Sequence, residues 1–405
     1  MVCSKEMQAR TTLTLGNFFL TIVTTLVNYV FISYLSSFFS ETYIGLAIAG
    51  GSLVAIAAFV FLPGIVARYG AQKVLLYLVF AEMFALMTVS GLPHTAVSAA
   101  LILIVMSMQP LLYYELDLLL EATINGNDAT ARARTFFLTG GNAGAIVAPL
   151  MIATLLAGGE AYTTVFFAAA IVAVLFVVFF SARQLPKNAP PTLYHVRDTL
   201  VHIFRHRDLA AVTTGHFILY LFYLWAPFYV PAYLHGVLGI PWATLGWVFS
   251  IMLIPYVLIE YPAGWLADRV LGDKWLMLAG FLIAGTALAL ISTITASTPI
   301  VLIVVILVMT RVGAALTESM TEGHFYRRVS QQDIVSISVF RGVWPLANIV
   351  APLVGALIFS FDGFHYFFLI TGCCVALIGG MTALSITDFR REERTLPLSS
   401  QQAVQ

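Results

Sequence analysis

The sequence predicts an all-α membrane protein with twelve transmembrane helices in two six-helix bundles. Three observations predict this class. Of the 405 residues, 60% are hydrophobic and only 10% are charged, a composition that soluble domains of this size do not have. The apolar residues form continuous runs of about 20 residues, the length that a helix needs to cross a bilayer core. Short segments of the first half also return in the second half.

Twelve apolar runs, separated by short polar breaks, define the predicted helices. The strands of a membrane barrel would alternate apolar and polar residues, which these runs do not do. The first run is too long for the core of a signal peptide, so we expect an uncleaved first helix. The predicted spans cover 11–36, 42–67, 72–91, 96–120, 133–158, 161–184, 208–235, 242–267, 274–295, 298–324, 332–360 and 364–387.

The connection at 185–207 divides six spans from six, and it is first rich in proline and then basic. We therefore expect the following order along the chain: an N-terminal six-helix bundle at 1–184, a linker at 185–207, a C-terminal six-helix bundle at 208–388 and a disordered tail at 389–405. The linker contains an amphipathic pattern around 194–204, typical of a short helix that lies along the membrane surface.

The basic residues predict the orientation. Of the 20 Lys and Arg residues, all except Arg311 and Arg341 fall on one face of the twelve-span arrangement. By the positive-inside rule, both termini, the linker and the tail are then cytoplasmic, in a multi-pass protein of the plasma membrane, or cell inner membrane. The net charge of zero gives nucleic-acid binding no electrostatic basis. The three cysteines are too few and too badly spaced for a disulfide framework or a metal site, and we expect no metal and no cofactor.

Two pairs of repeated segments indicate that the halves are copies. The polar break Gly-Trp-Leu-Ala-Asp-Arg-Val-Leu-Gly-Asp-Lys at 264–274 has a degenerate counterpart, Pro-Gly-Ile-Val-Ala-Arg-Tyr-Gly-Ala-Gln-Lys, at 63–73. The segment Ile-Val-Ala-Pro-Leu occurs at 146–150 and again at 349–353. Glycine in such a break lets the chain turn sharply between two helices. A single charged turn could simply be a solvated loop, but a repeated one favours a function.

This organisation resembles the major facilitator superfamily of secondary transporters, over essentially the whole chain. The second break is similar to the family pattern Gly-x-Leu-Ala-Asp-Arg-x-Gly-Arg-Lys, with one inserted residue, through Gly264, Asp268, Arg269, Gly272 and Lys274. The first break retains Arg68, Gly70 and Lys73 but has Pro63 and Ala67 in place of the family's Gly and Asp. The resemblance implies alternating access, in which two bundles rock about a central site near the bilayer midplane.

Charged residues inside the membrane are functional candidates because an unpaired charge there costs several kcal/mol. At about 1.5 Å rise per residue, Glu260, Glu318 and Arg341 lie roughly 10–15 Å from the predicted cytoplasmic ends of their spans. With Arg68, Asp268 and Arg269, they form a predicted cytoplasmic gate. A purely structural pairing of buried charges is an equal alternative.

Arg311 lies deeper, at roughly 20 Å by the same count, and is predicted to bind substrate or couple to it. Helical spacing predicts polar stripes on spans 1, 4, 7 and 10, the four that line the central cavity in the resembled family. Hydrogen bonds between packed helices are the alternative explanation for such stripes. The predicted substrate-binding residues are Asn17, Thr21, Thr24, Asn28, Gln109, Tyr113, Tyr220, Tyr223 and Arg311.

Glu82 is the predicted proton carrier because, by its position, it is the only acid expected near the middle of the N-terminal half, and burial would raise the pKa of its carboxyl group toward working pH. The alternative is that Glu82 only pairs with a neighbouring polar group. His216 ranks second, since a lone histidine on a helix is more often a satisfied hydrogen-bonding group.

The predicted function is secondary active transport of a small organic molecule, coupled to protons, by a monomer in the lipid bilayer. Export by antiport is favoured because Gly140, Gly141, Gly144 and Pro149 partly resemble a helix-bending element of drug antiporters, although a packing kink explains them equally well. The alternative within transport is a symporter or exchanger that takes up an organic anion, suggested by Arg311. A sensor or scaffold would need an output domain. An enzyme is disfavoured because no acid, base and nucleophile come into plausible proximity.

Overall fold

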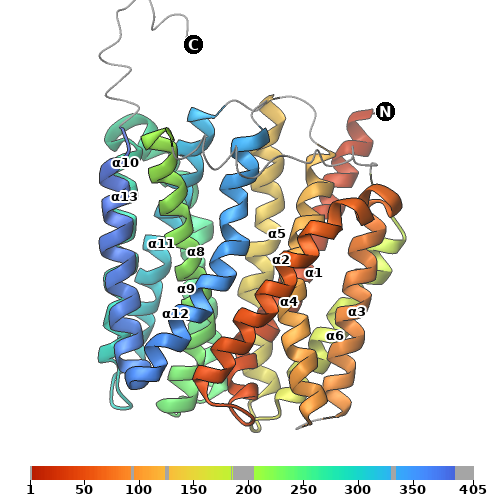
Figure 1. Ribbon diagram of the computed structural model, residues 1–405, viewed down its shortest axis with the longest axis vertical. Coiled ribbons are helices and arrows are strands. Elements are labelled where there is room, and N and C mark those ends of the chain that lie inside the picture. Colours follow the sequence, from red (N-terminus) through yellow and green to blue (C-terminus); the bar gives the residue numbers. More distant parts are fainter. Residues whose placement is uncertain are drawn as a thin grey trace, which may run out of the picture. The chain divides into compact units, whose positions relative to one another are not determined.

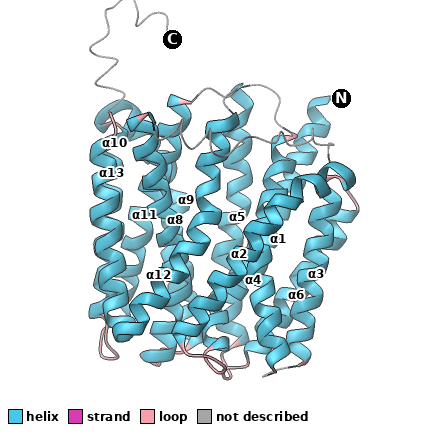
Figure 2. Ribbon diagram, in the orientation of Figure 1, coloured by secondary structure: helices cyan, strands magenta, loops and turns pink. Residues whose placement is uncertain are grey.

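The computed structural model describes residues 2–92, 95–123, 127–183, 185, 205–329 and 334–387. Throughout these residues the regular structure is helical, and no strand occurs in them (Figures 1 and 2). The α-helices are α1 (Val2–Leu35), α2 (Glu41–Tyr69), α3 (Ala71–Gly91), α4 (Ala96–Glu121), α5 (Asn127–Leu155), α6 (Tyr162–Ser181), α8 (Arg207–Pro231), α9 (Trp242–Leu266), α10 (Asp273–Leu290), α11 (Ile300–Arg328), α12 (Ile334–Cys374) and α13 (Gly380–Ser385). Short 3₁₀ or π segments extend some of them: η1 (Ala232–Val237), η2 (Ala267–Leu271), η3 (Ile291–Thr293) and η4 (Val375–Gly379).

The predicted class, a helical membrane protein, is confirmed. Within the described ranges, 11 helical segments are long and apolar enough to cross a membrane, and Tyr43–Ala55 of α2 is a shorter apolar segment. The second predicted span lies within α2, so a total of twelve crossings stays a prediction. The amphipathic helix expected around 194–204 and the tail at 389–405 lie outside the described residues.

The last two predicted spans follow one another without a break in α12. Their membrane-crossing segments are Gly342–Ser360 and Tyr366–Ser385. Between these segments stands Gly363, whose φ of +67° belongs to a region that residues with a Cβ rarely adopt. The glycine therefore allows the chain to change direction where the two spans meet.

The two repeated polar breaks have the same backbone conformation at equivalent glycines. Gly70, between α2 and α3, has φ of +84° and ψ of 144°. Gly272, between η2 and α10, has φ of +78° and ψ of 165°. A side chain at either position would strain the backbone. The structure thus agrees with the duplication that the sequence indicates, because the equivalent residue of each copy makes the same turn.

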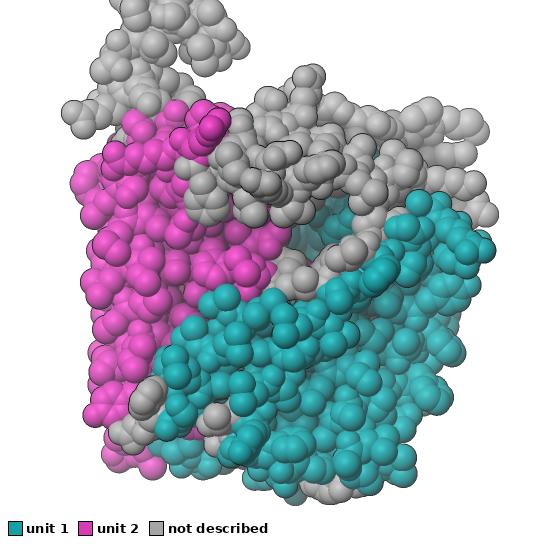
Figure 3. Space-filling view, in the orientation of Figure 1, with its two compact units in different colours: residues 1–192, 227–253, 348–361 teal, residues 193–226, 254–347, 362–405 magenta. Residues whose placement is uncertain are grey.

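Contacts divide the chain into two compact units, which Figure 3 colours separately. Unit 1 comprises Met1–Thr192, Pro227–Leu253 and Asn348–Phe361. Unit 2 comprises Leu193–Ala226, Ile254–Ala347 and Asp362–Gln405. Unit 1 therefore contains the six N-terminal helices together with two segments from the second half of the sequence.

Close helix packing holds unit 1 together. Helix α1 lies against α5 and α6, and α3 lies against α4 and α6. A Cβ at Gly140 or Gly144 of α5 would collide with the backbone of α1, at the carbonyl oxygens of Thr14 and Phe18. Small residues that allow such an approach are the usual basis of helix association in membranes.

One of the two additional segments of unit 1 crosses α5 at the first Ile-Val-Ala-Pro-Leu repeat. A Cβ at Gly246 of α9 would meet the Pro149 carbonyl oxygen and the Ala153 Cβ of α5. One turn further along α9, Ser250 Oγ donates a hydrogen bond of 2.8 Å to the Ile146 carbonyl oxygen. The small residues of α9 thus fit directly against the backbone of the repeat.

The other segment crosses α2 at the second repeat in the same way. A Cβ at Gly45 of α2 would lie 3.0 Å from the Pro352 carbonyl oxygen and from the Ala356 Cβ. Ser52 Oγ donates a hydrogen bond of 2.6 Å to the Asn348 carbonyl oxygen. Pro352, four residues later, has no N–H to donate to that oxygen. The two copies of the repeat therefore mark two equivalent helix crossings.

Unit 2 is built on a seam of small residues between α10 and its neighbours. Gly280 of α10 faces the Gly313 carbonyl of α11, and a Cβ at Gly313 would in turn meet the backbone of Ala284. Gly285 of α10 faces Gly372 of α12 in the same manner. These contacts place α10 and α11 close together along much of their length.

Candidate functional site

The polar stripe of span 1 forms a connected hydrogen-bond chain in unit 1. Asn17 Nδ2 donates to the Phe137 carbonyl oxygen of α5 at 3.0 Å, and Thr21 Oγ1 donates to Asn17 Oδ1 at 3.4 Å. Tyr113 of α4 reaches the same stripe, with its hydroxyl 3.2 Å from Thr21 Oγ1 and 2.8 Å from Thr24 Oγ1. Four predicted substrate-binding residues are therefore in contact, and they also connect α1, α4 and α5.

The other two predicted residues of unit 1 do not join this chain. Asn28 has an enclosed Oδ1 without a hydrogen-bond partner. Gln109 is buried, and its Nε2 lies 3.8 Å from the sulfur of Met106 on its own helix. Both keep unused or weakly used polar groups inside the unit, so a role in binding stays a prediction for each.

Glu82 is completely buried, and neither of its carboxylate oxygens has a hydrogen-bond partner. Its helix α3 is buried against α4 and α6, and the residues above and below it on the same face are apolar: Leu75, Val79, Leu86 and Val89. A charge without a partner costs several kcal/mol in such a place, so the neutral, protonated carboxyl group is favoured in this arrangement. A group of this kind is suited to taking up and releasing a proton when its surroundings change.

Glu115 of α4 is a second buried carboxyl group without a hydrogen-bond partner, and the sequence analysis assigned it no role. It is fully buried, and both of its carboxylate oxygens lack a hydrogen-bond partner. The signal in the sequence was its position within an apolar span. Spacing directed attention instead to the stripe of Gln109 and Tyr113, which leaves Glu115 on another face of the helix.

In unit 2, the predicted residues of α8 lie in an aromatic cluster. The His216 ring stacks on Phe340 with centroids 4.1 Å apart and meets Tyr220 edge to face at 4.6 Å. His216 Nδ1 is 3.4 Å from Thr321 Oγ1 of α11. Tyr220 in turn stacks on Trp344 of α12 at 6.3 Å. His216 is thus a packed and hydrogen-bonded side chain, and its part in proton coupling stays a prediction.

A hydrogen bond of Tyr223 connects the predicted substrate-binding residues with the predicted gate residues. Its hydroxyl donates a hydrogen bond of 2.5 Å to Glu318 Oε2 of α11. Tyr223 was predicted to bind substrate and Glu318 to belong to the cytoplasmic gate. One hydrogen bond therefore connects a residue predicted to bind substrate with a residue predicted to belong to the gate.

Arg311 is 3% exposed, and its Nε and Nη1 atoms have no hydrogen-bond partner. Its guanidinium carbon lies 5.2 Å from the centroid of the Phe222 ring of α8. This distance is typical of a cation–π contact, which occupies a face of the guanidinium group and leaves its in-plane donors unused.

The predicted cytoplasmic gate cannot be assembled from the described residues. Arg68 is exposed at the end of α2, with its guanidinium carbon 5.3 Å from the centroid of the Tyr69 ring. The backbones of the other members lie in α9, η2 and α12, but the side chains of Glu260, Asp268, Arg269 and Arg341 lie outside the described residues.

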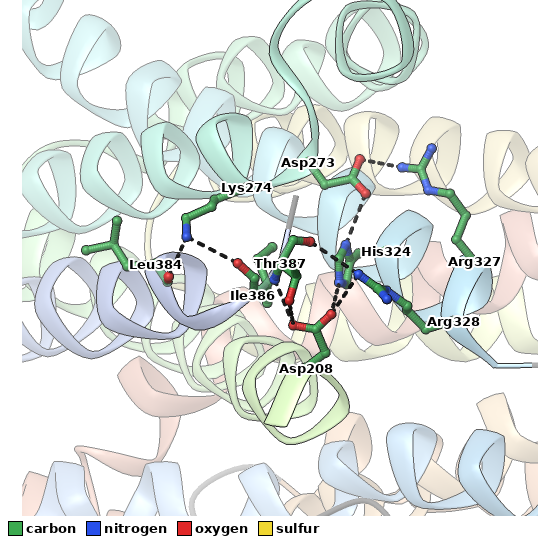
Figure 4. Close-up of polar contacts among 9 residues, drawn as sticks. All are labelled: Asp208, Asp273, Lys274, His324, Arg327, Arg328, Leu384, Ile386 and Thr387. Atoms are coloured by element: carbon green, nitrogen blue, oxygen red, sulfur yellow. Dashed lines mark hydrogen bonds and ion pairs between the residues drawn. The ribbon is translucent and has the colours of Figure 1, made fainter. Parts of the chain in front are cut away.

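A charged cluster at one end of unit 2 was not predicted (Figure 4). Asp273, the first residue of α10, is buried and forms an ion pair with Arg327 of α11. Its other carboxylate oxygen is 3.1 Å from Nδ1 of His324, which is 1% exposed. His324 Nε2 lies 3.7 Å from the carboxylate of Asp208 on α8. The histidine therefore stands between two carboxylates on two different helices.

The cluster also fixes the end of α13. Asp208 pairs with Arg328 at 2.9 Å and accepts hydrogen bonds from the backbone N–H and the hydroxyl of Thr387. Lys274 Nζ donates to the carbonyl oxygens of Leu384 and Ile386 at 2.6 and 3.2 Å. Four helices, α8, α10, α11 and α13, thus meet through charged side chains. Spacing along one helix could not reveal this, because the cluster joins residues of α8, α10 and α11 with the end of α13.

The comparisons with known proteins agree with this architecture. Residues 213–403 match the sequence model of the Major Facilitator Superfamily. Among solved structures, the nucleoside transporter NupG, in a mutant form, is similar with a TM-score of 0.72 and 15% identity, over 94% of this chain and 100% of that one. A bacterial homologue of the human lysosomal transporter Spinster gives 0.73 and 12%, over 94% and 98%. The peptide transporter POT, in complex with sulfate, gives 0.70 and 14%, over 93% and 94%. The curated proteins contain no significant match in sequence.

Proposed function

We propose that this chain is a transporter of the major facilitator superfamily, whose sequence model matches residues 213–403, and that it moves a small organic molecule across the membrane by alternating access, with protons as the coupling ion. The proposal places both termini in the cytoplasm and the protein in the plasma membrane, as the distribution of basic residues predicts. The superfamily is known for this mode of transport, in which two bundles expose a central site to one side at a time.

The observation that carries proton coupling is the buried, unpartnered carboxyl group of Glu82. Coupling needs a group that is protonated in one state and deprotonated in another, and Glu82 has no fixed partner that would hold it in either form. The hydrogen-bond chain from Asn17 to Tyr113 lies in the same unit and supplies hydroxyl and amide groups for the substrate. On α8 and α11, Tyr223 and Arg311 supply the corresponding groups of unit 2.

The glycines of span 5 do not support a direction of transport. Gly140 and Gly144, which favoured export at the level of sequence, are accounted for by the close approach of α5 to α1. Export by antiport stays a prediction. An inward proton gradient drives export when proton and substrate move in opposite directions and uptake when they move together, and proteoliposomes can distinguish the two directly.

A transport assay with matched variants tests the proposal. Ligands are first found by the thermal stabilisation of the purified full chain, and their movement into proteoliposomes is then measured with a pH gradient of either sign. Glu82→Gln keeps the shape of the side chain but cannot release a proton, so it should abolish the gradient-driven part of transport and leave exchange at equal pH intact.

The matched control is Glu115→Gln, which changes the other buried and unpartnered carboxyl group of unit 1. We expect it to retain gradient-driven transport. If accumulation is unchanged in Glu82→Gln, Glu82 is not the carrier, and if only Glu115→Gln loses it, Glu115 takes that role. Absence of any response to the gradient in the unaltered protein would refute proton coupling.

A further inference from the structure

The buried cation of α11 lacks a counter-charge in the part of the chain that the structure describes. Arg311 is 3% exposed, and Nε and Nη1 make no hydrogen bond. Its buried neighbours one turn away on the same face of the helix are apolar, namely Leu307, Ala314 and Ala315, and the first acid on that face is Glu318, two turns away, which accepts a hydrogen bond from Tyr223. Arginine stays charged in proteins, so this position cannot be relieved by losing a proton.

Two other arginines of α11 show how such charges are usually satisfied in this protein. Arg327 pairs with Asp273, and Arg328 pairs with Asp208 at 2.9 Å. Both lie at the end of the helix and are more exposed than Arg311, at 34% and 23%. The deepest arginine of the three, where an unpaired charge is most costly, is therefore the one without an acidic partner.

The geometry of the guanidinium group limits what can complete the site. Its N–H donors point outward in the plane of the group, so a partner for the unused Nε and Nη1 has to lie near that plane. A carboxylate is planar and matches these donors in geometry and charge. The Phe222 ring adjoins the ring of Tyr223, with centroids 5.8 Å apart, and Tyr223 in turn lies 6.2 Å from Tyr220 and from Tyr256. An apolar or aromatic body would fit such a lining better than a sugar or a second charge.

We propose that Arg311 is an anion-binding residue for the substrate, and that the substrate is a small organic acid with one carboxylate and an apolar or aromatic body. This inference rests on the proposed function, because it assigns the ligand class of the transport site. The ligand-free protein carries an unpaired buried charge, and binding of the carboxylate neutralises it. Arg311 thereby gives the site a large preference for the anion over a neutral analogue of the same shape.

The first experiment compares each acid with its amide on the purified full chain at neutral pH. The probes are benzoate and benzamide, 3-phenylpropionate and 3-phenylpropionamide, and hexanoate and hexanamide. At least one acid should raise the midpoint of thermal unfolding and quench tryptophan fluorescence, while its amide binds about 10- to 100-fold more weakly, as expected for a lost charge-assisted hydrogen bond. Equal effects of acid and amide in every pair, or no effect of any acid, would overturn the inference.

The second experiment needs no ligand. Arg311→Met removes the charge and keeps an unbranched chain of similar length, so the ligand-free variant should unfold at the same or a higher temperature than the parent, because an uncompensated buried charge is lost. Arg328→Met, on the same helix, removes a charge that has a partner and should lower the midpoint. If Arg311→Met lowers the midpoint of thermal unfolding as much as Arg328→Met does, Arg311 has a structural role and the inference is refuted.

The variants also separate this inference from the proposed function. Arg311→Met should abolish the preference for the acid, and Arg311→Lys should restore part of it because the positive charge returns. Glu82→Gln should keep the preference, since proton release is not needed for binding. Proton-driven transport without any acid preference would refute the ligand class alone, and an Arg311-dependent acid preference without proton-driven transport would refute the coupling alone.

Discussion

We infer that the crossing of α9 over α5 opens during the proposed transport cycle, and this inference can be tested. The perturbation is Gly246→Ala. The new Cβ would overlap the Pro149 carbonyl oxygen and the Ala153 Cβ, which belong to a helix and cannot move aside as a flexible side chain would. Overpacking of this kind costs about 1–3 kcal/mol in the state that contains the contact. A state in which α5 and α9 have separated does not carry this cost.

That difference corresponds to a shift of about 5- to 150-fold in the equilibrium between the two states. The assay is the rate of maleimide labelling at a Ser250→Cys reporter, in a chain whose three native cysteines have been replaced. Position 250 is 5% exposed, so the thiol should react mainly when the helices separate. We expect Gly246→Ala to accelerate labelling by a factor within this range.

The matched control lies on the same helix. A Cβ at Gly264 of α9 would meet nothing within 4 Å, so Gly264→Ala should leave the labelling rate at position 250 unchanged. The thermal unfolding midpoint of each variant shows whether the fold is kept. If Gly246→Ala labels no faster than the parent, or the control labels as fast as Gly246→Ala, the crossing does not open during transport in the way we infer.

Two further variants test contacts inside single units. Asp273→Asn should lower the stability of unit 2 by about 3 kcal/mol, because it leaves His324 and Arg327 without their carboxylate. The control is Glu160→Gln, which removes the charge of an acid that is 67% exposed in its pair with His235 and should change the midpoint of thermal unfolding little. Equal shifts of the midpoint in the two variants would contradict the buried network. Tyr113→Phe should weaken the binding of any ligand found in the thermal screen by about 5- to 10-fold, which corresponds to the loss of one hydrogen bond from the hydroxyl group. The control Tyr77→Phe changes an exposed tyrosine and should leave ligand binding unchanged. Unchanged ligand affinity in Tyr113→Phe would remove the α1–α4 chain from the binding site.

The helices could be predicted because one physical requirement decides them. A segment that crosses a bilayer has to satisfy its backbone internally and be apolar over about 20 residues, so continuous apolar runs become long helices. The positions of the breaks followed from glycine, and Gly70 and Gly272 do adopt the conformation that only glycine tolerates. The division into units could not be predicted, since it depends on which helices cross at the repeats and not on where the linker lies.

The candidate site was predictable where its members share one helical face. Asn17, Thr21 and Thr24 were found by spacing, and they contact one another and Tyr113. The same rule placed Asn28 in the stripe, but the chain of contacts does not reach it, because spacing predicts a common face and not a common partner. Glu115 and the pairing of Asp273 with His324 were missed for the complementary reason: burial and contacts between helices are tertiary properties.

Equivalent positions of the two copies carry an uncharged side chain in unit 1, Gln72, and a charged side chain in unit 2, Lys274. Two residues after its positive-φ glycine, each copy has a side chain that donates to carbonyl oxygens at the end of the last helix of its half. In unit 1, Gln72 Nε2 donates to the Phe180 and Arg183 carbonyl oxygens at 3.1 and 2.6 Å, at the C-terminal end of α6. In unit 2, Lys274 Nζ donates to the Leu384 and Ile386 carbonyl oxygens at the C-terminal end of α13.

Both copies therefore use a side chain to donate hydrogen bonds to the end of a helix, and only the donor group differs. A neutral amide serves unit 1, where Ala71 precedes it, whereas Lys274 follows Asp273, which binds His324 and Arg327. The carbonyl oxygens at a helix end need a donor in either case, so the amide is sufficient for the structural task. The contacts of Asp273 with His324 and Arg327 come in addition to this task, so we expect the packing at this end of unit 2 to respond to charge substitutions.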